Sequence, residues 1–150
     1  MDNIDLKILG CLKNNAREKA SAIGEEIGLS VSAVTERIKR MEASGLIRQY
    51  TLIVDQKKIG NSVSAIMEVA MEHPRYGDAF LEMIDSIPSI ISCYCVTGDF
   101  DYILHIVTDS TDGLEAIYSR LRSFDGVADT KTHIILRKSK DEYTVLPSVI

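Results

Sequence analysis

The second half of the sequence contains one pattern twice, with the two copies offset by 37 residues. In each copy an apolar run of strand character is followed by a helical stripe of apolar residues and then by a second apolar run. The matched positions are Val69 with Ile106, Phe80 with Ile117, Ile84 with Leu121, Ser86 with Ser123, Ile87 with Phe124 and Ile90 with Val127. Two strand–helix–strand units in tandem predict a β-α-β-β-α-β sandwich of the ferredoxin-like type, with two helices on one face of a four-stranded sheet. The other face of the sheet is then left open for a partner.

The strands of this sandwich are expected at 63–71, 90–96, 102–108 and 130–137. The two helical stripes are Tyr76, Phe80, Met83, Ile84 and Ile87 in the first copy, and Leu114, Ile117, Tyr118 and Leu121 in the second. Between the second and third strands, Gly98-Asp99-Phe100-Asp101 is expected to form a turn.

The first half predicts three short helices, at 3–14, at 19–27 and from after Ser30 to about Ala43. Gly28 ends the second helix, because glycine accepts the left-handed conformation, and Ser30 is a good N-cap for the third. Two helices joined by so tight a turn predict a helix-turn-helix, whose second helix enters the major groove of DNA. A strand is expected at 46–55, followed by a turn at 57–60.

The distribution of charge also points to the first half as the part that contacts nucleic acid. Residues 1–60 carry 10 Lys and Arg against 8 Asp and Glu, whereas residues 61–150 carry 7 against 14, within a whole-chain net charge of −5. On the third helix Val34, Ile38 and Met41 face the other helices, and polar side chains lie opposite them. Lys and Arg neutralise phosphates, while Ser, Thr and Glu can address base edges. The candidate DNA contacts are Arg17, Lys19, Ser30, Ser32, Ala33, Thr35, Glu36, Arg37, Lys39, Arg40 and Arg48. The alternative from the residues alone is an ordinary three-helix bundle with a solvated face.

Several segments, in order along nearly the whole chain, resemble the Lrp/AsnC transcription regulators, also called the leucine-responsive or feast/famine family. They are Asp5-Leu6-Lys7-Ile8-Leu9, Asn15-Ala16-Arg17, Gly28-Leu29-Ser30-Val31-Ser32-Ala33-Val34, Arg37-Ile38-Lys39-Arg40-Met41-Glu42, Gly45-Leu46-Ile47 with Tyr50, Val96-Thr97-Gly98-Asp99-Phe100-Asp101-Tyr102, and Thr130-Lys131-Thr132. The resemblance implies an α+β chain: a winged helix-turn-helix with a hinge strand over 1–60, then a ferredoxin-like effector and assembly domain over 61–150. It also implies homodimers that assemble further, commonly into octamers, and a sequence-specific regulator of transcription that binds double-stranded DNA.

The turn at 98–101 and the strand around Thr130 are the candidate effector site. A free amino acid carries an ammonium group, which needs a carboxylate, and a carboxylate group, which needs N–H donors. Gly98 allows close backbone approach, and Asp99 or Asp101 could supply the negative partner. The predicted effector-binding residues are Gly98, Asp99, Phe100, Asp101, Thr130 and Thr132. The resemblance places a small amino-acid-like effector near them, at a contact between dimers, although from composition alone 98–101 is only a polar hairpin turn. Phe100 stands where tyrosine is common in the family.

Two other functions compete with this interpretation. An architectural DNA-binding protein without an effector would share the same surfaces. An enzyme similar to the sirohaem decarboxylases would use histidines, and the chain offers His73, His105 and His133. The sequence contains no nucleophile–base pair and no carboxylate dyad, so we expect no catalytic residue and no cofactor.

The cysteines and the chain start favour a cytoplasmic protein without a metal. Three cysteines cannot all pair within one chain, and Cys93 and Cys95 lie two apart on one strand face. Cys11, Cys93 and Cys95 are therefore expected to be small thiols in a reducing cytosol, without the further ligands a metal site needs. The acidic start of the sequence predicts no secretory signal, and no stretch is long and apolar enough for a membrane helix.

Overall fold

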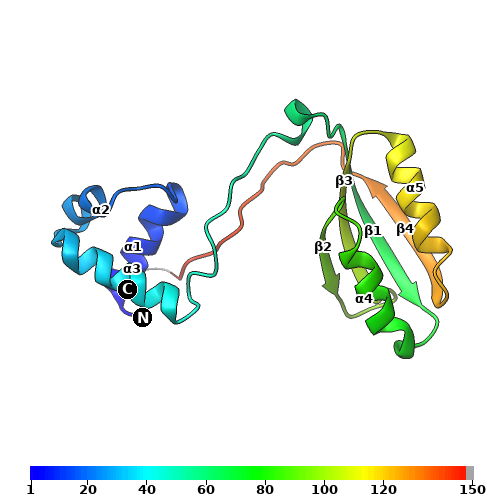
Figure 1. Cartoon of the computed structure of the whole chain (residues 1–150), viewed down its shortest axis with the longest axis horizontal. Coiled ribbons are helices and arrows are strands. Elements are labelled where there is room, and N and C mark those ends of the chain that lie inside the picture. The colour runs from blue at the N-terminus through cyan, green and yellow to red at the C-terminus, as the bar shows by residue number, and fades with distance from the viewer. Residues whose placement is uncertain (148–150) are drawn as a thin grey trace. The chain divides into compact units, whose positions relative to one another are not determined.

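The computed structural model describes residues 1–147, and the chain divides into two units. The first comprises Met1–Ile53 and the segment that begins at Lys140, and the second comprises Val54–Ser139. The first unit contains α1 (Asn3–Asn14), α2 (Ala20–Ile27) and α3 (Val31–Ala43) (Figure 1). The second contains η1 (Gln56–Ile59), β1 (Val63–Met71), η2 (Pro74–Tyr76), α4 (Gly77–Asp85), β2 (Ile90–Cys95), β3 (Tyr102–Thr108), α5 (Thr111–Arg122) and β4 (Val127–Ile134).

The four strands of the second unit form one antiparallel sheet in the order β2-β3-β1-β4. Helices α4 and α5 lie together on one face of that sheet (Figure 1). The units β1-α4-β2 and β3-α5-β4 are the two copies of the 37-residue repeat. The predicted ferredoxin-like α+β fold is therefore confirmed.

The core of this unit lies between the sheet and its two helices. It consists of Ala65, Met67, Val69, Phe80, Ile84, Ile87, Leu104, Ile106, Leu114, Ile117 and Leu121. The matched positions of the repeat occupy equivalent places in it: Phe80 and Ile117 come from the two helices, and Val69 and Ile106 from the two central strands. Each large side chain so buried stabilises the fold by about 1.5–3 kcal/mol before entropy is counted.

The first unit has its own core of Ile8, Cys11, Ile23, Val34 and Met41. Helix α1 begins with a capping box, in which Asp2 and Asp5 each accept a hydrogen bond from the other's backbone N–H. Helix α3 begins as predicted, since the Ser30 hydroxyl accepts a hydrogen bond from the Ala33 N–H.

The strand predicted at 46–55 is wrong, because this segment forms no regular element. Its apolar residues are present, but Leu52 and Ile53 are 84% and 63% exposed. A strand needs a second strand to pair its N–H and C=O groups, and none of the residues in 1–147 forms a ladder with this segment. Strand β4 also begins at Val127 rather than at residue 130. It is an edge strand with mostly exposed side chains, so little apolar pattern marks its start.

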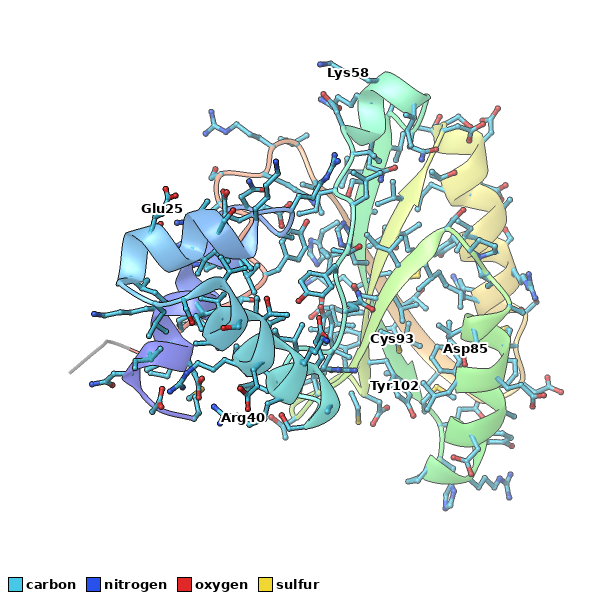
Figure 2. The ribbon with its side chains drawn as sticks, turned by 60° about the vertical axis from the view of Figure 1, so that its left-hand side comes forward. Glu25, Arg40, Lys58, Asp85, Cys93 and Tyr102 are labelled. Carbon is cyan, nitrogen blue, oxygen red and sulfur yellow. The ribbon has the colours of Figure 1, made fainter. Side chains whose placement is uncertain are left out.

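The three cysteines carry free thiols. Cys11 is buried, and Cys93 is half-buried on β2, the strand next to that of Tyr102 (Figure 2). Burial raises the pKa of the Cys11 and Cys93 thiols above the usual value, which keeps both protonated at neutral pH. Cys93 pairs with Leu104 and Cys95 with Tyr102, so the predicted shared face of the two cysteines is confirmed.

Two glycines in helices provide a matched test of the packing of the first unit. A Cβ atom at Gly24 would lie 2.5 Å from the carbonyl oxygen of Leu29, whereas a Cβ atom at Gly10 would meet nothing within 4 Å. We expect Gly10→Ala to raise the free energy of unfolding by about 0.5–1 kcal/mol. Gly24→Ala should lower it by about 1–3 kcal/mol, because a backbone atom must move. Urea denaturation of the two variants measures both values, and equal stabilisation by the two alanines would contradict the tight turn.

Candidate functional site

The turn between α2 and α3 has helix-turn-helix geometry. Gly28 adopts a φ of +73° at the end of α2, and the Leu29 N–H donates to the Gly24 carbonyl oxygen at 2.9 Å. Ser30 then caps α3, so only Gly28, Leu29 and Ser30 separate the two helices. This short connection holds α3 at a fixed angle to α2, as groove insertion requires.

Helix α3 has one face in the core and one face in solvent. Val34 and Met41 are buried, and Ile38 is half-buried against the same cluster. Ser32, Glu36 and Lys39 are exposed on the other side. The predicted division of this helix into an apolar and a polar face is confirmed.

The remaining candidate DNA-contact residues fall into three groups. Ser30 and Thr35 bond to the backbone of α3: Ser30 accepts from Ala33, and the Thr35 hydroxyl donates to the Val31 carbonyl at 2.8 Å. Ala33 lies half-buried beside them. Among the candidates, the exposed cations without an ion pair to any residue of the described chain are Arg17, Lys19, Lys39 and Arg48.

Arg37 and Arg40 instead form ion pairs with the start of α1. Arg37 Nη1 donates to Asp2 Oδ2 and to Asp5 Oδ1, both at 2.8 Å. Arg40 Nη2 lies 3.2 Å from Asp5 Oδ1, and Arg40 projects from α3 (Figure 2). We call these four residues the Asp5 cluster. Its centre is buried, because the Asp5 side chain is only 3% exposed.

The Asp5 cluster keeps its carboxylates ionised. Burial alone would raise the pKa of Asp5, but the hydrogen bonds from Arg37 and from the Asp2 N–H, together with the Arg40 charge, outweigh it and lower that pKa. The pKa of Asp2 is also lowered, first by the Asp5 N–H and then by Arg37. Asp2 and Asp5 in turn raise the pKa of Arg37.

In the second unit a pocket of about 810 Å³ lies where the loop after β2 meets the open face of the sheet. Its lining residues are Glu68, Cys95, Val96, Thr97, Asp99, Phe100, Ile103 and Lys131. Of the predicted effector residues, the structure brings Asp99 and Phe100 to this pocket, beside Gly98 with its φ of +121°.

Asp101 holds the loop in place instead of lining the pocket. Its carboxylate accepts a hydrogen bond from the Met71 N–H at 2.6 Å, and its own N–H donates to the Val69 carbonyl oxygen at 2.9 Å. The Asp101 carbonyl oxygen accepts from the Val96 N–H at 2.9 Å, which closes the turn. Of the two aspartates, Asp99 is therefore the one that lines the pocket.

Thr130 and Thr132 lie on the other side of the sheet from this pocket. They pair with Val69 and Met67, whose side chains face the helices, and directly paired residues share a face. Lys131 between them pairs with Glu68, and both line the pocket. Neither residue is among the predicted effector residues, although the period-two alternation of β1 and β4 places both on the open face.

The pocket presents charges of both signs. Glu68 Oε2 lies 3.1 Å from His133 Nε2, while Lys131 and Asp99 form no ion pair with any residue from 1 to 147. Phe100 and Ile103 add apolar surface. A cation and a carboxylate around an apolar wall suit a small zwitterion with an apolar side chain.

Each of the three histidines has a hydrogen-bond partner within its own unit. His73 Nδ1 accepts from the Arg75 N–H at 3.1 Å, His105 Nε2 lies 2.9 Å from the Ser64 hydroxyl, and His133 contacts Glu68.

Over residues 1–147, His, Cys, Asp and Glu side chains form no group that could hold a metal ion. No helix in the described part of the chain has the length and apolar character needed to cross a membrane.

Comparison with known proteins agrees with both units. Residues 1–42 match the AsnC-type helix-turn-helix domain, and residues 64–145 match the Lrp/AsnC ligand binding domain. The HTH-type transcriptional regulator LrpC of Bacillus subtilis is 39% identical over 135 residues, which are 90% of this chain and 91% of that protein.

Two similar solved structures are complexes with L-methionine. The feast or famine regulatory protein of M. tuberculosis gives a TM-score of 0.90 at 29% identity, over 97% of this chain and 99% of that chain. A transcriptional regulator of Neisseria meningitidis gives a TM-score of 0.91 at 25% identity, over 97% of this chain and 96% of that chain.

A helix-turn-helix followed by a ligand-binding α+β sandwich defines a class of transcription regulators. This chain belongs to the Lrp/AsnC family of that class, which confirms the resemblance read from its sequence.

The buried carboxylate of the Asp5 cluster predicts a large and specific effect on stability. Asp5→Asn should lower the free energy of unfolding at pH 7 by about 2–4 kcal/mol, because it leaves Arg37 with a single charged partner. The matched control is Lys13→Gln, which removes the exposed 3.0 Å pair with Glu142 and should cost less than about 1 kcal/mol. Urea denaturation measures both, and equal losses would contradict the buried pairing.

The pH dependence of that effect has a definite sign. The pKa of Asp5 is lower in the folded chain than its ordinary value of 3.8, so its stabilisation is fully present above about pH 4 and is lost as the pH falls through the folded pKa. The difference in melting temperature between the wild type and Asp5→Asn should therefore be constant from pH 7 to about pH 5 and shrink below pH 4. A difference that grows on acidification would contradict it.

Proposed function

We propose that residues 1–60 bind double-stranded DNA through α3 and that residues 61–150 bind an amino-acid effector and assemble the subunits. The observation that carries the proposal is the exposed polar face of α3, the second helix of the helix-turn-helix. The two parts of the chain also match the DNA-binding and ligand-binding domains of one regulator family. Effector binding then changes assembly or DNA affinity by linkage between the two sites.

In the proposed complex, the first turns of α3 enter the major groove. Ser32 and Glu36 address base edges, with Ala33 and Thr35 beside them. Lys39 contacts phosphate, together with three cations outside the helix. These are Arg17, Lys19 and Arg48.

The proposed effector is a free amino acid. Two similar structures contain L-methionine, and the pocket on the open sheet face offers complementary charges. Asp99 binds the ammonium group, and Lys131 with the backbone at Gly98 binds the carboxylate. Thr130 and Thr132 face away from this pocket and cannot contact an effector inside it. We therefore propose that these two residues contact an effector bound where one subunit meets another.

We further propose that the chain is a cytoplasmic homodimer, in larger assemblies such as an octamer, and acts by binding rather than by catalysis. The open sheet face and the apolar segment at 50–54 provide surface for association: Tyr94 is 60% exposed, Ile91 is 54% exposed, and Leu52 and Ile53 project into solvent. Assembly would place several recognition helices on one DNA molecule.

The DNA-binding proposal predicts a strong dependence on salt. The logarithm of the binding constant for the DNA upstream of the chain's own gene should fall linearly with the logarithm of the KCl concentration, by about 0.9 for each phosphate contact. Fluorescence anisotropy with labelled duplex measures this slope, and a slope near zero would exclude the phosphate contacts.

The effector proposal predicts ligand-induced thermal stabilisation. At least one of the twenty amino acids, at 100 times its dissociation constant, should stabilise the fold by about 2.7 kcal/mol. This corresponds to a rise in melting temperature of about 5–10 °C for a chain of this size. Asp99→Asn should abolish the rise and Glu82→Gln, on the helix-covered side, should retain it. No rise with any amino acid would favour the architectural alternative, in which DNA binding needs no effector.

A further inference from the structure

Only part of the positive charge of the recognition helix is available to DNA. Helix α3 carries Arg37, Lys39 and Arg40. Lys39 is exposed and forms no ion pair with the described residues, whereas the Arg37 side chain is 23% exposed and in contact with two carboxylates. The cations of this helix therefore differ in how accessible their charge is to a DNA phosphate.

The Asp5 cluster is electrically neutral. Its two arginines and two aspartates carry two formal charges of each sign, all within direct contact. Both oxygens of Asp5 are occupied: Oδ1 accepts from Arg37 and Arg40, and Oδ2 accepts from Arg40 and from the Asp2 N–H at 3.1 Å. Asp2 itself is 53% exposed, so a phosphate that approached Arg37 would meet a carboxylate on the way.

We infer that Asp2 and Asp5 are specificity-determining residues that hold Arg37 away from the DNA backbone while they fix the position of α3 against α1. Sequence-independent binding comes almost entirely from phosphate neutralisation. A neutral cluster therefore fixes the position of the recognition helix without increasing its attraction to nonspecific DNA. Base contacts from the exposed face then account for a larger share of the binding energy.

Arg40 has an intermediate role in this arrangement. One of its terminal nitrogens bonds to Asp5, but its side chain is 63% exposed. A guanidinium has five N–H donors, so Arg40 can contact a phosphate while Asp5 orients it. Arg37 is the cation that the cluster withholds.

The inference rests on the proposed DNA binding, and its test separates the two. The full-length wild type, Arg37→Gln, Lys39→Gln and Asp2→Asn are titrated onto a labelled duplex of random sequence at several KCl concentrations. Melting curves confirm that each variant is folded. Asp2→Asn is the informative variant, because asparagine is as good an N-cap as aspartate and keeps the start of α1 while it removes the charge.

We expect Arg37→Gln to leave the salt slope of the wild type unchanged, and Lys39→Gln to make it shallower by about 0.9 for each recognition helix engaged. Asp2→Asn should make the slope steeper and the binding to random duplex several-fold tighter at low salt. If Arg37→Gln is unfolded, Asp2→Asn still decides the question.

A slope made shallower by Arg37→Gln to the extent seen with Lys39→Gln would overturn the inference, as would an unchanged slope in Asp2→Asn. A wild-type slope near zero would overturn the proposed DNA binding, and the inference with it. A clear wild-type slope that Arg37→Gln weakens would overturn the inference alone.

Discussion

The position of the recognition helix depends on one buried carboxylate. Asp5 belongs to the capping box of α1 and also accepts hydrogen bonds from Arg37 and Arg40 of α3, so a single side chain joins the start of one helix to the middle of another. An ionised group this deeply buried is stable only when its lone pairs are filled, and the four hydrogen bonds that fill them come from Arg37 and Arg40 of α3 and from the Asp2 N–H at the cap of α1. The same contacts that make the charge tolerable therefore fix the geometry of the DNA-binding face.

In the second unit the period of two along the strands separates the residues of the core from those of the open sheet face. Val69, Met67 and the residues that pair with them face the helices, and Glu68 with Lys131 faces the opposite way. The loop after β2 adds Asp99 at the edge of that open face, while Asp101 anchors the loop to β1 through the Met71 N–H. A one-residue shift of β4 would exchange Lys131 for a threonine at the pocket, so the register of this edge strand decides its chemistry.

The sequence predicts features that depend on neighbours in the chain and misses those that depend on partners in space. Helices α1 to α5 and the Ser30 cap follow from local periodicity and capping, and the internal repeat predicts how the strands combine. The segment 46–55 has a strand pattern but no pairing partner in the described chain, a condition that no local pattern reveals. The ion pairs of Arg37 with Asp2 and Asp5 likewise join residues far apart in the sequence, so no local pattern predicts them. Which sites bind DNA or effector remains a prediction.

The neutral cluster has a consequence for how this regulator can control transcription. If Arg37 is withheld as we infer, the candidate DNA contacts retain four exposed cations without an ion pair, Arg17, Lys19, Lys39 and Arg48, together with Arg40, which is paired with Asp5. The acidic second half of the chain adds seven more negative than positive charges, which oppose general attraction to DNA. In the proposed complex, one recognition helix with so few phosphate contacts binds weakly, and linked copies multiply affinity without new contacts. Under the proposed assembly and effector binding, occupancy of DNA depends steeply on assembly, so an effector that shifts only the association of subunits acts as a switch.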